Sequence, residues 1–140
     1  MVLRVLRVRM LRRMLPLIVA VGLVLGATAY AHHSIDATYL SDKEITLEGK
    51  ILLFEFRNPH SFLQIEAPDK DGTLQRWSLE WRSSGRLGQD GIKRDTLKIG
   101  EVVTVTGNPS RTAADHRALL KTLRRKSDGF GWGGPGQAVD

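Results

Sequence analysis

Four histidines are the side chains of this 140-residue sequence that are best suited to chemistry: His32, His33, His60 and His116. The sequence has no cysteine, and its three methionines all lie within the first 14 residues. Because Cu(I) prefers thiolate and thioether ligands, a metal held by the rest of the chain would be a nitrogen-bound Cu(II) or Zn(II) ion. Motifs of phosphate-binding loops, zinc proteases and serine hydrolases do not occur, so we expect binding in place of catalysis.

His32 gains a second metal-binding group if the chain is cut after Ala31. Its free α-amine and ring Nδ1 can then chelate one ion, because both nitrogens belong to the same residue. The imidazole of His60 would add a third nitrogen, and such a set suits Cu(II). His33 follows directly and is a further candidate ligand. The residues therefore predict a Cu(II) or Zn(II) site made by the new N-terminus and the loop that contains His60.

Two polar residues are expected to orient these ligands. Asn58 stands two residues before His60 in an Asn-Pro-His turn, and Glu80 lies near the end of an expected strand. The alternative is that this turn is purely structural, with Asn58 capping it and His60 bonded to a neighbouring strand. His116 follows an aspartate in a polar loop, so we expect it to be an ordinary surface residue.

A second function hypothesis needs no metal. In this interpretation the chain is an adaptor that presents one face of its β-domain, including Arg76 and Trp81, to an envelope protein or a glycan. Against it, Trp77 and Trp81 share a face at spacing i, i+4 on a strand, and most such tryptophans pack in a core. A copper oxidase-like enzyme is the third hypothesis.

The first 31 residues have the three-part layout of a secretory signal. A basic segment is followed by an uncharged run, residues 15–27, and then by Thr28-Ala29-Tyr30-Ala31. Ala29 and Ala31 fit the A-x-A cleavage pattern, which predicts a cut before His32 and a periplasmic or secreted product. The alternative is an uncleaved membrane anchor, since residues 15–31 approach the length that spans a bilayer.

Charge argues against a nucleic-acid partner. The formal net charge is +6, but five of the 21 basic residues lie within residues 1–13. Beyond them, 16 basic residues face 15 acidic ones. A nearly neutral domain lacks the basic patch that nucleic-acid binding requires.

Apolar alternation and β-branched residues predict strands at residues 44–57, 60–67, 73–81 and 101–106, which must position the candidate ligands. Residues 116–126 fit either a helix or a strand. We expect a strand there, because a four-stranded barrel would leave an unpaired edge. We expect the first strand to bulge or bend at Gly49, where the alternation ends. A turn or two of helix is expected within residues 82–87.

Five short strands with one irregular connection predict an all-β, OB-like barrel over residues 32–128. An SH3-like barrel or a partial sandwich fits the same spacing. Residues 129–140 contain five glycines and one proline, which predicts a flexible tail.

Several motifs occur in an order that resembles a known family. They are Ala31-His32-His33-Ser34, Asn58-Pro59-His60-Ser61-Phe62, Trp77-Ser78-Leu79-Glu80 and Val103-Thr104-Val105-Thr106-Gly107. Together they resemble a family of small exported bacterial proteins catalogued as a domain of unknown function. The resemblance covers roughly residues 28–128. It implies export and a single small domain, and it implies no activity.

Overall fold

The structure is a computed structural model that describes residues 35–134. All its strands belong to one compact unit, residues 38–140. The predicted signal segment and the two predicted ligands His32 and His33 lie outside the described residues. Within the described range, no helix has the length and hydropathy needed to span a bilayer.

The first three strands form an antiparallel meander: β1 (Ile45–Glu55), β2 (Phe62–Pro68) and β3 (Leu74–Glu80). The expected bend at Gly49 was misplaced, since the register shift in β1 lies between Ile51 and Leu53. Gly49 lies where the backbones of β1 and β2 approach each other closely. A Cβ there would stand 2.4 Å from the carbonyl oxygen of Glu66, so only glycine fits.

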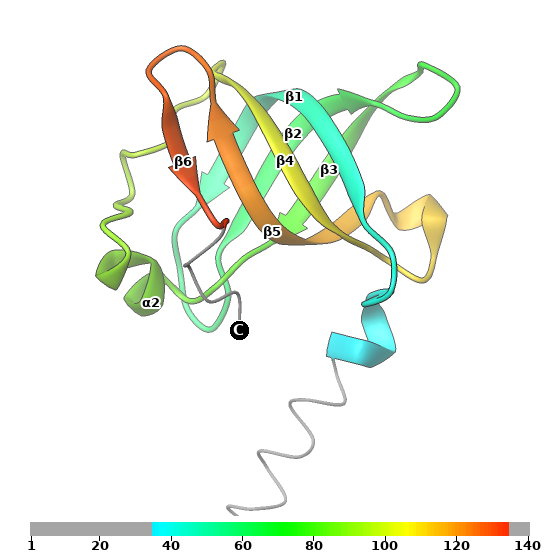
Figure 1. The fold of residues 1–140 in the computed structure, drawn as a ribbon, viewed down its shortest axis with the longest axis horizontal. Helices are drawn as coiled ribbons and strands as arrows, with labels where there is room; N and C mark the ends of the chain where they lie inside the picture. The colour runs from blue at the N-terminus through cyan, green and yellow to red at the C-terminus, as the bar shows by residue number, and fades with distance from the viewer. Residues whose placement is uncertain (1–34, 135–140) are drawn as a thin grey trace, which may run out of the picture. The chain divides into compact units, whose positions relative to one another are not determined.

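Two further strands close the sheet into a barrel. β4 (Val102–Pro109) pairs antiparallel with β1 and with β5 (Arg117–Arg125). β5 also pairs in parallel with β3, over Ser78–Glu80. The order β3-β2-β1-β4-β5, with β3 joined to β5, is a closed five-stranded barrel of the predicted OB-like kind (Figure 1).

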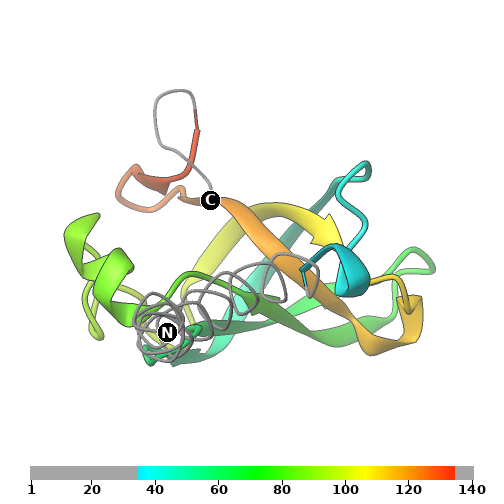
Figure 2. The same ribbon diagram turned by 90° about the horizontal axis from the view of Figure 1, so that it is seen from below.

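The two ends of the barrel are covered differently. Helix α2 (Ser84–Gln89) lies at the end where β1 finishes and β2 begins, and its Leu87 is fully buried. The predicted turn of helix is therefore present, shifted by two residues. The β2–β3 turn and the short helix η1 (Ala113–Asp115) lie at the opposite end (Figure 2). That opposite end is called the open end below.

The flexible tail was expected to begin at residue 129, but the residues directly after it are ordered. Phe130–Trp132 form a short strand, β6, which pairs antiparallel with β5. Trp132 is 2% exposed and packs edge-on against Trp81, with ring centroids 4.8 Å apart. Burial of a large aromatic ring offsets the entropy of ordering the glycines around it. Residues 135–140 lie outside the described part of the chain.

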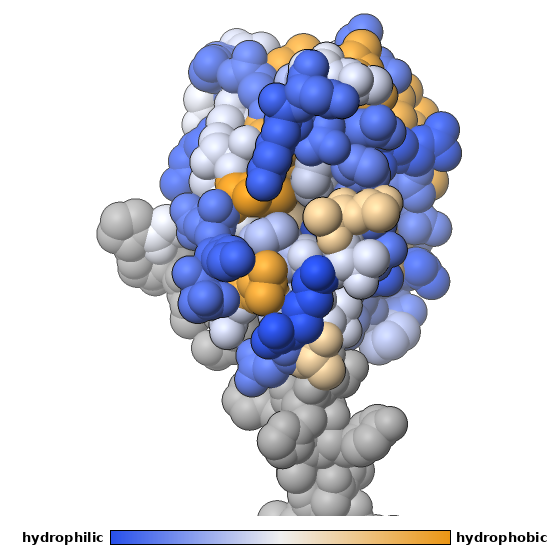
Figure 3. Space-filling view, turned by 90° about the vertical axis from the view of Figure 1, so that its right-hand side faces the viewer, coloured by the Kyte–Doolittle hydropathy of each residue, from blue (hydrophilic) through white to orange (hydrophobic). Residues whose placement is uncertain are grey.

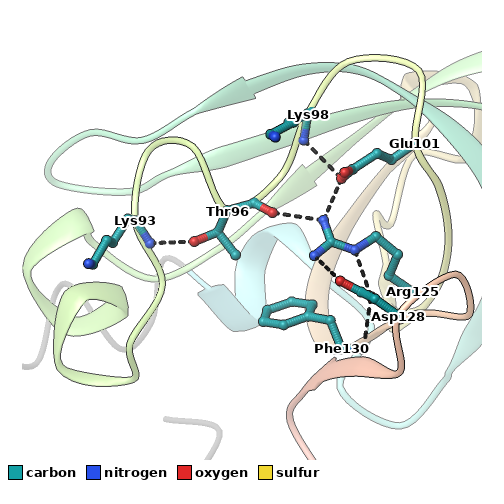
Figure 4. A network of polar contacts seen from close by, with 7 residues as sticks. All are labelled: Lys93, Thr96, Lys98, Glu101, Arg125, Asp128 and Phe130. Carbon is teal, nitrogen blue, oxygen red and sulfur yellow. Dashed lines mark hydrogen bonds and ion pairs between the residues drawn. The ribbon is translucent and has the colours of Figure 1, made fainter.

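A polar clasp holds the β5–β6 hairpin to the segment before β4 (Figure 4). Arg125 is 9% exposed, and its guanidinium donates to the carbonyl oxygen of Thr96 at 2.8 Å and to Glu101 at 2.5 Å. Its other nitrogens donate to both carboxylate oxygens of Asp128, at 3.0 and 2.8 Å. The buried charge is therefore paired on two sides, as burial of a charge requires.

Candidate functional site

Glu80 is a carboxylate on the outer face of β3 that is nevertheless only 9% exposed. Three side chains cover it. His60 contacts its Oε1 through Nδ1 at 2.5 Å. The Tyr39 hydroxyl donates to its Oε2 at 2.5 Å, and Arg117 donates to the same oxygen at 3.3 Å. A buried carboxylate needs such donors, so the four residues form one polar unit, called here the Glu80 cluster.

Strand pairing brings the predicted residues His60 and Glu80 together. Phe62 lies opposite Glu80 in the β2–β3 register, so His60 stands two residues before the paired position. The backbone of Ser61 fastens this corner, since its N–H donates to the Arg82 carbonyl at 3.0 Å. The ring of His60 thus lies at the end of a paired and well-anchored strand.

The geometry of His60 leaves one ring nitrogen for a ligand. Its side chain is 47% exposed, and Nδ1 faces the carboxylate. A neutral imidazole that donates through Nδ1 presents the lone pair of Nε2. Histidines that ligate metals almost always donate their other nitrogen to a carboxylate or carbonyl, which fixes the tautomer and raises ligand basicity. His60 therefore has the surroundings of a metal-ligating or proton-accepting side chain.

Tyr39 joins the segment that precedes β1 to this cluster. Burial, followed by the hydrogen bond and the charge of Glu80, raises the pKa of Tyr39 above its ordinary value. The phenol thus stays protonated and remains a donor. The backbone around it is also held, because Leu40 donates to the Pro109 carbonyl at 2.9 Å and Tyr39 bridges to Ser110.

Asn58, predicted to orient the ligands, contacts α2 and not His60. The Oδ1 of Asn58 accepts from the Ser84 hydroxyl at 2.9 Å, so this side chain ties the loop to α2.

Within residues 35–134 no group of three or more His, Asp or Glu side chains is arranged to hold a metal. A site with three such ligands that includes His60 would therefore need at least one of them from outside that range.

The two residues predicted for the adaptor face differ in exposure. Arg76 is exposed on the outer surface of β3, as that hypothesis requires. Trp81 is 2% exposed and belongs to the core, in contact with the Phe54 and Trp132 rings, so it is wrong as a binding-face residue. Core packing of Trp77 and Trp81 is confirmed.

His116 is not the ordinary surface residue that we expected. Only 21% of its side chain is exposed. Its Nε2 lies 3.0 Å from Asp69 Oδ2, and its ring meets Trp77 edge-on at 5.2 Å. The hydrogen bond from His116 is the main reason why the pKa of Asp69 lies below its ordinary value.

Two members of the Glu80 cluster were missed from the sequence. Tyr39 lies 41 residues from Glu80 and Arg117 lies 37 residues from it, and neither belongs to a motif. Arg117 is the first residue of β5, where β5 joins β3 in parallel. Only the parallel closure of the barrel places it near Glu80, and that closure has no local sequence signal.

Comparison with known proteins gives one match. Residues 21–118 match the model of a family described as "Family of unknown function (DUF6152)". No curated protein and no solved structure matches the chain.

Proposed function

Since this chain belongs to the family of unknown function DUF6152, whose membership assigns no activity, we propose a function from the geometry around His60. The protein is a binding module for Cu(II) or Zn(II) that is exported to the periplasm or secreted. The His60 Nε2 is one ligand. The imidazole and free amine of His32, and the imidazole of His33, supply the others.

The contact between His60 and Glu80 carries the proposal. A carboxylate that holds Nδ1 prepares the opposite nitrogen to bind a metal, and Glu80 is itself held by Tyr39 and Arg117. Nearly half of the imidazole is open to solvent, so an ion can reach it.

The position of Tyr39 makes the ligand set compatible with chain length. Its hydroxyl and His60 Nδ1 both contact the Glu80 carboxylate. His33 precedes Tyr39 by six residues and His32 by seven. Residues 35–38 are helical, so the chain from these histidines to Tyr39 spans about 15–19 Å, a length over which His32 and His33 can approach His60.

Two measurements test the proposal in sequence. Intact mass of the protein purified from the producing cell should show the loss of residues 1–31, which gives His32 a free amine. Retention of those residues would contradict the amine chelate. Titration of the same protein with Cu(II), followed by electron paramagnetic resonance, should show one nitrogen-ligated ion per chain.

Variants assign the ligands. We expect His60→Ala, and insertion of three alanines between Ala31 and His32, each to weaken Cu(II) binding about tenfold or more, and Glu80→Gln to weaken it less. His116→Ala is the matched control, because its imidazole is engaged by Asp69. If both ligand variants bind Cu(II) like the unchanged protein, the site does not exist.

A further inference from the structure

We propose a second binding site, for an anionic amphiphile with a single acyl chain and a carboxylate head, in a groove at the open end of the barrel. The groove has a volume of about 940 Å³, within the range of small-molecule sites. Its walls are residues 40–45, the β2–β3 turn and the β4–β5 loop. This groove is called the open-end groove below, and it is independent of the metal proposal.

The inner lining of the groove is apolar. Leu40, Ile45, Trp77 and Pro109 all line it. Trp77 is buried in the core, whereas the other three are only partly buried and offer surface to an occupant. Apolar patches lie between hydrophilic side chains on this side of the molecule (Figure 3). Such a lining gains free energy when an acyl chain displaces water from it.

Cations stand on each wall of the groove. Lys43 comes from the segment before β1, Lys70 from the β2–β3 turn and Arg111 from the β4–β5 loop. Within the described residues, the ammonium groups of Lys43 and Lys70 make no hydrogen bond or ion pair. Arg117 also lines the groove but is engaged by Glu80. Two lysines from separate walls are thus available to an incoming anion.

The acids of the groove are mostly engaged within their own turn. Asp69 accepts from His116 through one oxygen and from the Lys70 backbone N–H through the other. Asp71 accepts from the backbone N–H of Thr73 at 2.9 Å. Glu44 is the remaining acid of the lining. The Asp69 and Asp71 oxygens are thus already directed at donors of the protein, and Lys43 and Lys70 are the groups of the lining that can meet an anionic head group.

The concave shape selects among anionic amphiphiles. A groove of this volume encloses one chain, whereas a membrane surface would meet a flat or convex patch. The proposal therefore commits to a free, monomeric fatty acid as the ligand class and not to a bilayer.

Calorimetric titration of the full protein, as the producing cell leaves it, with monomeric laurate tests the site. We expect one laurate per chain, and dodecanol, which lacks the charge, to bind at least tenfold more weakly. Trp77 lines the groove, so its fluorescence should change on binding, and Trp77→Phe should reduce that change. The absence of both heat and a fluorescence change with laurate, or equal affinity for dodecanol, would overturn the proposal.

Charge variants locate the head group. Lys43→Glu and Lys70→Glu should each lower laurate affinity at least threefold. Lys50→Glu is the matched control, because Lys50 is exposed on β1 and does not line the groove. Equal affinity of all three variants would contradict the site. Sedimentation with phosphatidylglycerol vesicles in the absence of laurate binding would show a membrane surface as the partner, and would also contradict it.

Discussion

Glu80 shows at the scale of a residue how a charge can lie on the outside of a strand and still be buried. Its position on β3 predicted a solvent-facing side chain near His60, and the contact with His60 follows from hairpin register. Burial comes from Tyr39 and Arg117, which the strand pattern could not reveal because both contacts join distant parts of the chain. The sequence thus predicted the pair but not the cover over it.

Two buried tryptophans form a matched pair for a stability test. Trp132 donates from Nε1 to Asp90 at 2.8 Å, whereas Trp81 Nε1 has no acceptor within residues 35–134. Both rings are 2% exposed. We expect Trp132→Phe to lower the unfolding free energy by about 1 kcal/mol more than Trp81→Phe, because only the first change also removes a hydrogen bond. Urea denaturation measures both, and equal losses would contradict the prediction.

At the scale of elements, apolar alternation and β-branched residues predicted four barrel strands, because these patterns are typical of a half-buried sheet. The fifth strand was predicted because a four-stranded barrel would leave an unpaired edge, and β5 confirms it. Two features were not predictable in this way. The irregularity of β1 lies after Ile51 and not at Gly49, since Gly49 is required by the neighbouring strand and not by its own. β6 was hidden because glycines dominate its composition, although Trp132 makes its order favourable.

Gly107 tests how closely β4 and β5 approach. A Cβ at this position would lie 2.4 Å from the carbonyl oxygen of Leu119, so the backbone must shift to accept Gly107→Ala. We expect that variant to lose about 1–3 kcal/mol of stability. Gly88→Ala in α2 is the control, because nothing lies within 4 Å of its Cβ, and it should gain up to about 1 kcal/mol. Thermal unfolding compares them, and a neutral Gly107→Ala would refute the close approach.

The Arg125 clasp predicts sensitivity to acid. Partial burial of Glu101 opposes its ionisation, but the Lys98 backbone N–H and the Arg125 guanidinium outweigh burial and lower its pKa below 4.5. The hydrogen bond from Arg125 likewise lowers the pKa of Asp128 below 3.8. Carboxylates with a lowered folded-state pKa stabilise the fold above their unfolded pKa and lose that contribution as the pH falls through the folded one.

Unfolding at two pH values measures this contribution. Between about pH 6 and pH 3, Arg125→Met should lose less unfolding free energy than the unchanged protein, because its two carboxylates no longer have lowered pKa values. Arg86→Met, an exposed change in α2, is the control and should keep the original slope. Asp128→Asn removes one of the two carboxylates, so its loss of unfolding free energy between the same pH values should also be smaller than that of the unchanged protein. An Arg125→Met slope identical to the control would contradict the assignment.

At the scale of the whole molecule, the number and spacing of strands predicted the barrel, and the closed strand order confirms it. Of the candidate metal site, only the contact between His60 and Glu80 could be predicted from the sequence and then compared with the structure. Glu80 belongs to β3 and His60 stands two residues before β2, so the β2–β3 register brings them together, whereas His32 and His33 lie outside the described residues. The open-end groove had no sequence signal, because its walls come from three separated connections.

The join between β3 and β5 extends over only three residue pairs, from Ser78 to Glu80 on β3, whereas β4 is paired along both edges. Short joins open first, so the Ser78 amide, which donates to the His116 carbonyl at 2.9 Å, should exchange its hydrogen for deuterium faster than the amides of β4. Equal exchange rates would contradict this. Glu80 and Arg117 both belong to the join, and Trp77 directly precedes it on β3. A ligand bound at either proposed site would stabilise the pairing of β3 with β5. Its binding would then be detected as slower hydrogen–deuterium exchange of the amides in this join.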